Sequence, residues 1–196
     1  MPHMNQERTA PLAPNLDVLR SEIDRIDDAL LELVEQRLAA SLAIAARKEA
    51  DGDGLLKLRP RREAAVIARL VSRARTASPE LVTQMWRGLM AHGLQAQLRT
   101  ELVLCTSGDR AALQERVRAR FGAAAPIHWA DAPADAIAAA REREAVAIIE
   151  RSLPIALEED DNLIMFDALH NEDGSLLAVA IGRVAPEDAI LWEAAR

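Results

Sequence analysis

The chain has 196 residues, of which half are hydrophobic, and it carries 24 Lys and Arg against 31 Asp and Glu. That length suits one domain or two small ones, and the hydrophobic content excludes wholesale disorder. The acidic balance and the scarcity of aromatic residues, with no Tyr, two Phe and three Trp, argue against a nucleic-acid partner.

The ends and the single cysteine exclude several further classes. Residues 1–14 contain no apolar run, so we expect a disordered tail and no signal peptide. No stretch approaches the roughly 20 apolar residues that a membrane-spanning helix needs, which predicts no membrane partner. Cys105 is the only cysteine, which excludes an intrachain disulfide and fits a cytoplasmic location.

A long helix is predicted to begin at Leu16, capped by Asn15, with Asp17 in its first turn. Its apolar residues recur in steps of three and four and form a heptad-like seam up to the Asp-Gly-Asp-Gly stretch at 51–54. About 36 helical residues span roughly 54 Å. Such a helix overhangs any core that its own chain can build, so we expect an intertwined helical homodimer.

Two more helices are predicted before residue 100. One covers about residues 61–75 and follows Pro60. The next covers about residues 79–99, because Ser78 is a favourable cap and Pro79 suits the first helical position. Residues 15–100 are therefore expected to be an all-helical domain.

The pattern changes after Thr100, where apolar strands alternate with helices. This alternation predicts a small α/β domain over residues 101–196. The charge changes as well, from +2 over residues 1–100 to −9 over residues 101–196. Predicted strands lie at 101–108, 126–131, 145–150, 163–170 and 176–184, and predicted helices at 109–121 and 133–143.

Arg37 stands in the seam of the first helix where Leu or Ile is expected. A buried guanidinium without a partner costs several kcal/mol, so Arg37 needs an anion. Lys48 lies eleven residues further on, on the same face and about 16 Å away, so the two cations could hold a small dianion between them. Arg20 points about 100° away and could reach only a neighbouring subunit's site. Alternatively, Arg20 and Lys48 are solvated charges and Arg37 pairs with Glu63.

These residues stand in an order that resembles a known family. The segments are "LRSEIDRIDDALLELVEQRLAASLAIAARK" at 19–48, "RPRREAAVIARL" at 59–70 and "GLQAQ" at 93–97. Together they are similar to the AroQ-type chorismate mutases, which are intertwined all-helical dimers. The resemblance covers about residues 15–98. It implies a chorismate mutase of aromatic amino-acid biosynthesis (the shikimate pathway).

The resemblance also implies a role for each matching residue. Arg20 looks like the arginine that reaches into the neighbouring subunit's site, and Arg37 like the carboxylate binder within the chain. Lys48 resembles the lysine that grips both a carboxylate and the ether oxygen of chorismate. Glu63 matches the acid that accepts from the substrate hydroxyl, and Gln97 matches the donor to the ether oxygen.

Two positions depart from the family pattern. Arg59 stands where the family often has Asp, and Gly93 stands where it often has Ser. The first change replaces a hydroxyl-binding carboxylate by a cation, which together with Arg61 or Arg62 could steer a dianion toward the pocket. The second removes one donor to a carboxylate. Both residues are expected to line the substrate site.

The reaction implied by the resemblance is a rearrangement within one molecule, so neither a cofactor nor a metal is expected. Two alternatives stay open on the same scaffold: an isochorismate-pyruvate lyase, and a catalytically degenerate, mutase-like regulatory or binding protein. Residues 101–190 faintly resemble a shortened prephenate dehydratase domain that lacks its Thr-Arg-Phe motif, so no dehydratase activity is expected there.

Overall fold

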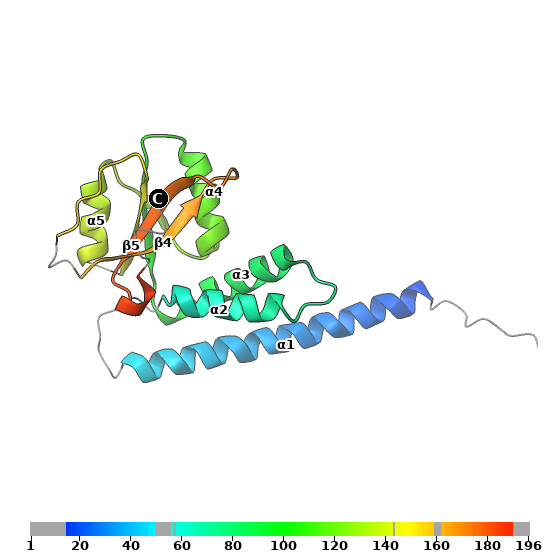
Figure 1. Ribbon diagram of the computed structural model, residues 1–196. Coiled ribbons are helices and arrows are strands. Elements are labelled where there is room, and N and C mark those ends of the chain that lie inside the picture. The colour runs from blue at the N-terminus through cyan, green and yellow to red at the C-terminus, as the bar shows by residue number, and fades with distance from the viewer. Residues whose placement is uncertain (1–14, 50–55, 57, 143, 159–161, 190–196) are drawn as a thin grey trace, which may run out of the picture. The chain divides into compact units, whose positions relative to one another are not determined.

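The computed structural model describes residues 15–49, 56, 58–142, 144–158 and 162–189 (Figure 1). The predicted tail at 1–14 and the predicted helix stop at 51–54 lie outside these residues. By the contacts between its residues, the chain divides into two compact units, Met1–Ala39 and Ala40–Arg196. The predicted boundary near residue 100 stays a prediction.

Helix α1 runs over Leu16–Glu49, a length of 34 residues, and confirms the long first helix. Asn15 caps it as predicted, because its Oδ1 accepts from the amide of Asp17 at 3.2 Å. Within the single chain, α1 leaves a row of large apolar side chains between 43% and 60% exposed. They are Leu16, Val18, Leu19, Ile23, Ile26, Leu30, Leu31, Leu33, Leu42 and Ile44.

Helices α2 (Pro60–Val71) and α3 (Pro79–Gln97) pack against each other. Ser78 caps α3 as predicted, since its Oγ accepts from the amide of Leu81 at 3.2 Å. The predicted ends at 75 and 99 were too late. In α2 the hydroxyl of Ser72 donates to the carbonyl of Arg69 at 2.8 Å, and the chain unwinds into turns. In α3, Leu98 is already extended, with φ −152° and ψ 123°.

The second half contains a five-stranded sheet with the strand order β2-β1-β3-β5-β4. β1, β2 and β3 are parallel, whereas β5 is antiparallel to both β3 and β4. Every predicted strand and helix of this half is present; β3 has the predicted bounds, and the other elements are shorter than predicted. The elements are β1 Glu101–Cys105, α4 Arg110–Phe121, β2 Ile127–Trp129, α5 Pro133–Glu142, β3 Ala145–Glu150, β4 Ile164–His170 and β5 Leu176–Gly182.

Two apolar clusters lie on the two faces of the sheet, and Figure 1 shows α4 and α5 on opposite sides of the strands. The α4 cluster includes Phe121, packed edge-on to Phe166 of β4 with ring centroids 6.5 Å apart. Leu56 and Leu58, which precede α2, are buried in the same cluster. The segment that leads into α2 therefore belongs to the core of the sheet.

The start of α2 is also held from the far end of the chain. Arg59, the residue before α2, provides no side-chain cap. Instead, buried Asp188, in the 3-10 turn η2 (Pro186–Asp188), accepts from the amide of Arg61 at 3.0 Å. The Leu56 amide likewise donates to the carbonyl of Arg183 at 2.7 Å. Free amides at a helix start favour an anion, so Asp188 stabilises α2 although 127 residues separate it from Arg61.

Gly122, which ends α4, is expected to tolerate no side chain. Its φ is 76° and its ψ is 178°, a region that only glycine adopts readily, and a Cβ there would lie 2.6 Å from the Cβ of Ala91. Backbone strain of this kind costs about 1–3 kcal/mol before the collision with α3 is added. Gly122→Ala should therefore lower the free energy of unfolding by about 3 kcal/mol, measured by urea denaturation.

Gly174→Ala is the matched control, because Gly174 also has a positive φ, of 82°, but faces open space. It should lose only the strain energy. Equal losses in the two variants would show that α3 and α4 do not pack as closely as the structure indicates.

Candidate active site

Three of the predicted site residues lie on α1. Arg20 is exposed and forms a 3.3 Å ion pair with Asp17, one turn before it. Arg37 is half-buried. Lys48 is the penultimate residue of α1, and its side chain lies outside the described residues. The roles predicted for these three cations stay predictions.

Two predicted site residues meet in the first turn of α2. Arg59 is the N-cap residue, and its carbonyl accepts from the amide of Glu63 at 2.9 Å. The Arg59 side chain is half-buried and donates to the carbonyl of Leu58 at 3.3 Å. Glu63 stands where the helix dipole favours an acid. The local sequence thus positions Glu63 at the helix start.

The two remaining residues lie one turn apart on α3. Gly93 is buried, and Gln97, the last residue of the helix, is half-buried. A spacing of four residues places both on the same face of the helix. Nearby, the side-chain amide of Gln95 donates to the carbonyl of Thr100 at 2.9 Å and ties the end of α3 to the start of β1.

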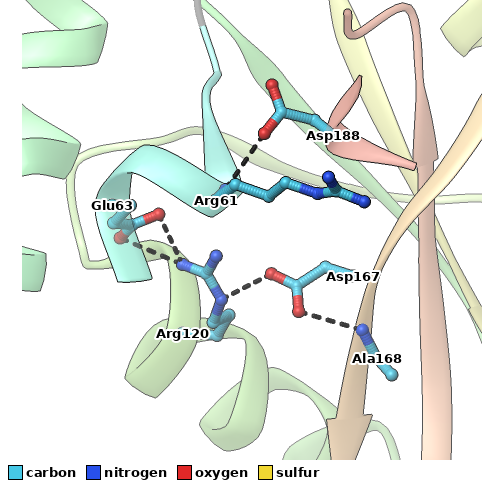
Figure 2. Close-up of polar contacts among 6 residues, drawn as sticks. All are labelled: Arg61, Glu63, Arg120, Asp167, Ala168 and Asp188. Atoms are coloured by element: carbon cyan, nitrogen blue, oxygen red, sulfur yellow. Dashed lines mark hydrogen bonds and ion pairs between the residues drawn. The ribbon is translucent and has the colours of Figure 1, made fainter. Parts of the chain in front are cut away.

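Glu63 is part of a charged cluster that joins α2 to the sheet (Figure 2). Arg120 of α4 donates through one nitrogen, Nη1, to both Glu63 oxygens at 3.1 Å each. Its Nε forms an ion pair with Asp167 Oδ2 of β4 at 2.5 Å. The other Asp167 oxygen accepts from the Ala168 amide at 2.9 Å. One guanidinium therefore bridges two carboxylates that come from different elements.

The cluster is largely withdrawn from water. The side chains of Glu63, Arg120 and Asp167 are only 16%, 15% and 18% exposed. Burial acts to lower the pKa of Arg120, but the attraction of Asp167 and Glu63 outweighs burial, so the pKa is raised. Removing one partner of a buried ion pair leaves an uncompensated charge, which typically costs about 3–5 kcal/mol.

Arg87 of α3 is a second cation close to this cluster. Burial and the nearby charge of Arg120 lower its pKa, while Glu63 and Asp167 act in the opposite direction. Its Nε is buried and has no hydrogen-bond partner within the part of the chain that the structure describes. With Arg87 counted, two cations balance two carboxylates.

Sequence reasoning missed Arg87, Arg120 and Asp167, although two signals were present. Asp167 interrupts the apolar run "LIMFDALH", where an acid is unfavourable in a strand. Arg120 directly precedes the core residue Phe121. A charge inside an apolar pattern needs a partner, but nothing in the sequence indicates that the partner of Arg120 lies 57 residues earlier.

A cavity of about 490 Å³ lies between α3 and the end of α4. Arg87 lines it, whereas none of the predicted site residues does. The lining consists of Pro79, Glu80, Thr83, Gln84, Arg87, Gly88, Arg118, Ala119 and Gly122. The guanidinium of Arg118 donates to three backbone carbonyls, those of Gly122, Ala123 and Ala125. The lining thus contains none of the residues predicted to bind the substrate.

The strand order places a second potential ligand position at the carboxyl ends of β1 and β3. In this structure the carboxylate of Glu150 fills it. Oε2 accepts from the Thr106 hydroxyl at 2.6 Å and from the amides of Ser107 and Gly108 at 2.8 and 3.2 Å. The Thr106 contact first, and then these amides, lower the pKa of Glu150 in spite of its burial. The donors of the β1–α4 loop thus serve the protein's own carboxylate.

Comparison with known proteins identifies the helical part. Residues 19–98 match the family model "Chorismate mutase type II". The N-terminal helical region thus matches a chorismate mutase type II (AroQ) domain, and a small mixed α/β sheet with helices follows it. Both parts of the predicted fold class are confirmed. The match covers less than half of the chain, and no curated protein and no solved structure matches it.

Two other features are absent from the described residues, a metal-binding cluster and a membrane-spanning helix. No group of three or more His, Cys, Asp or Glu side chains there is arranged to hold a metal ion. No helix in those ranges combines the length and the apolar character that crossing a bilayer requires.

Proposed function

We propose that the protein is a chorismate mutase that converts chorismate into prephenate. The observation that carries the proposal is the ordered set Arg20, Arg37, Lys48, Glu63 and Gln97 inside the family-matched span 19–98. These residue types suit the substrate, since arginines pair bidentately with carboxylates and chorismate is a dianion.

The reaction needs positioning and charge stabilisation. Arg37 and, from the neighbouring subunit, Arg20 would grip the two carboxylates and hold the substrate in its compact shape. Lys48 and Gln97 would donate to the ether oxygen, on which negative charge grows as the bond breaks. Glu63 would accept from the substrate hydroxyl. Arg59 and buried Gly93 would shape the pocket around it.

We further propose that the active form is a homodimer. The row of exposed apolar side chains on α1 supports this proposal, because several large aliphatic groups on one helix are costly to leave in water. A second α1 would bury them, and it would bring the exposed Arg20 to the partner's site. A cytoplasmic protein of aromatic amino-acid biosynthesis is the corresponding cellular role.

Incubation of the purified protein with chorismate should consume the substrate and yield prephenate, followed by absorbance and by chromatography. The product should accumulate, because a dehydratase activity is not expected of the α/β region. Salicylate fluorescence from isochorismate would instead identify a pyruvate lyase. A folded protein that binds chorismate without turnover would identify a mutase-like binding protein, and either result would refute the proposal.

A further inference from the structure

We propose that Arg120, held by Asp167, is a positioning residue of the mutase site, so that the α/β region supplies part of the catalytic apparatus. This inference rests on the proposed function, in which Glu63 accepts from the substrate hydroxyl. Arg120 lies on α4 and Asp167 on β4, outside the family-matched span, which ends at residue 98. The contact therefore lies between the sheet region and the helix that carries the substrate-binding acid.

The geometry of the contact fixes the orientation of Glu63 without using up its acceptors. Arg120 Nη1 lies 3.1 Å from each Glu63 oxygen, so the carboxylate is centred on a single nitrogen (Figure 2). Each carboxylate oxygen has two lone pairs and uses one to accept from Arg120. Each oxygen therefore retains a lone pair with which it could accept from a hydroxyl.

Asp167 determines where the guanidinium of Arg120 lies. Its Oδ2 pairs with Arg120 Nε at 2.5 Å, and its Oδ1 is fixed by the Ala168 amide at 2.9 Å. A series of contacts thus connects β4 to α2 through Ala168, Asp167, Arg120 and Glu63. Asp167 and Arg120 form an ion pair, whereas the contact of Arg120 with Glu63 is a charge-assisted hydrogen bond and that of Ala168 with Asp167 a backbone-to-side-chain one.

The low exposure of the cluster makes this arrangement rigid. With side chains only 15–18% exposed, water screens the three charges weakly, and Arg120 pairs with both acids at once. A catalytic group held in this way keeps its orientation before the substrate arrives, which is the condition for effective positioning.

A double-mutant cycle tests whether Arg120 acts through Glu63. In the wild-type background, Arg120→Met should lower kcat/KM for chorismate by about 10- to 100-fold. This is the range found in metal sites when a residue that orients a ligand side chain is removed, and Arg120 orients Glu63 in the same way. KM should change more than kcat, because a hydroxyl contact exists in both the ground and the transition state. In a Glu63→Gln background the same replacement should change kcat/KM by less than about twofold.

Three further variants separate positioning from a purely structural tie. Asp167→Asn should lower kcat/KM by less than Arg120→Met does. Arg120→Lys should keep part of the activity that Arg120→Met loses, because lysine supplies the positive charge but not the planar guanidinium with its several N–H donors. Arg116→Met is the matched control on the same helix, since Arg116 pairs with exposed Glu172 at 2.8 Å, and it should leave kinetics unchanged. Circular dichroism and thermal unfolding show the temperature range in which each variant is folded.

The outcomes distinguish this inference from the proposed function. Absence of turnover in the wild type refutes both. An active wild type with unchanged kinetics in folded Arg120→Met refutes only the inference. Equal losses in the wild-type and Glu63→Gln backgrounds would show that Arg120 acts independently of Glu63. A rise in kcat/KM in Arg120→Met would show that Arg120 competes with the substrate, which also overturns the inference.

Discussion

Replacement of Arg37 by alanine is expected to reduce kcat/KM for chorismate at least 100-fold, to be measured by steady-state chorismate consumption. The guanidinium is the proposed binder of a substrate carboxylate within the chain, and the methyl group of alanine donates nothing. Loss of one preorganised donor typically costs about 100- to 1000-fold in rate. Because Arg37 is half-buried, water cannot replace it as readily as it would replace an exposed group.

Arg25→Ala is the control for this variant. Arg25 lies on the same helix and pairs with exposed Glu22 at 2.6 and 2.9 Å. Exposed pairs of this type contribute little to stability, so the variant should keep full activity. Wild-type kinetics in a folded Arg37→Ala protein would remove the central support for the proposed function.

Mixing two inactive variants, Arg20→Ala and Arg37→Ala, should restore about one quarter of the wild-type activity, because half of the randomly assorted dimers are mixed and each then has one intact site of two. The restored site takes Arg37 from one chain and Arg20 from the other. The measurement is chorismate turnover after the variants are unfolded together and refolded in equal amounts.

Refolding each variant by itself gives the background for this experiment, and both should stay near zero. A mixture of Arg37→Ala with Glu63→Gln is a second control, because the proposal places Arg37 and Glu63 in one subunit's contribution to the site. That mixture should regain little. Absence of rescue in the first mixture would place Arg20 in its own subunit's site or outside the site.

The secondary structure could be predicted from local sequence signals. Asn15, Ser78 and Asp109 cap the helices that follow them, and each cap is an Asx or Ser residue before a periodic segment. The turn before β5 also follows a local signal, the pair Asp173-Gly174, in which Gly174 has a φ of 82°. The helix ends were harder to predict. At the end of α2, the Ser72 hydroxyl donates to the Arg69 carbonyl, and such a contact competes only weakly with the backbone hydrogen bonds that would continue the helix.

The surroundings of the site could not be predicted in the same way. Spacing along one helix relates Arg20, Arg37 and Lys48, because helical geometry is regular. No such regularity links Glu63 to Arg120 or Arg61 to Asp188, since those contacts depend on how the sheet packs against α2 and α3. Recognition of the family gave the expected role of Glu63 but nothing about its partner from outside the family-matched span.

Asp188 and Leu56 tie the start of α2 to the segment that follows β5, and this has a consequence for protein engineering. A gene truncated after Thr100 would encode all the family-matched residues, yet it would leave the α2 start uncapped and Leu56 and Leu58 without the strands that cover them. The covalent order of the chain suggests a module that can be excised and transplanted. The tertiary contacts show instead that α2 depends on the sheet region for its first turn, so a grafted or shortened version of this protein should keep both parts.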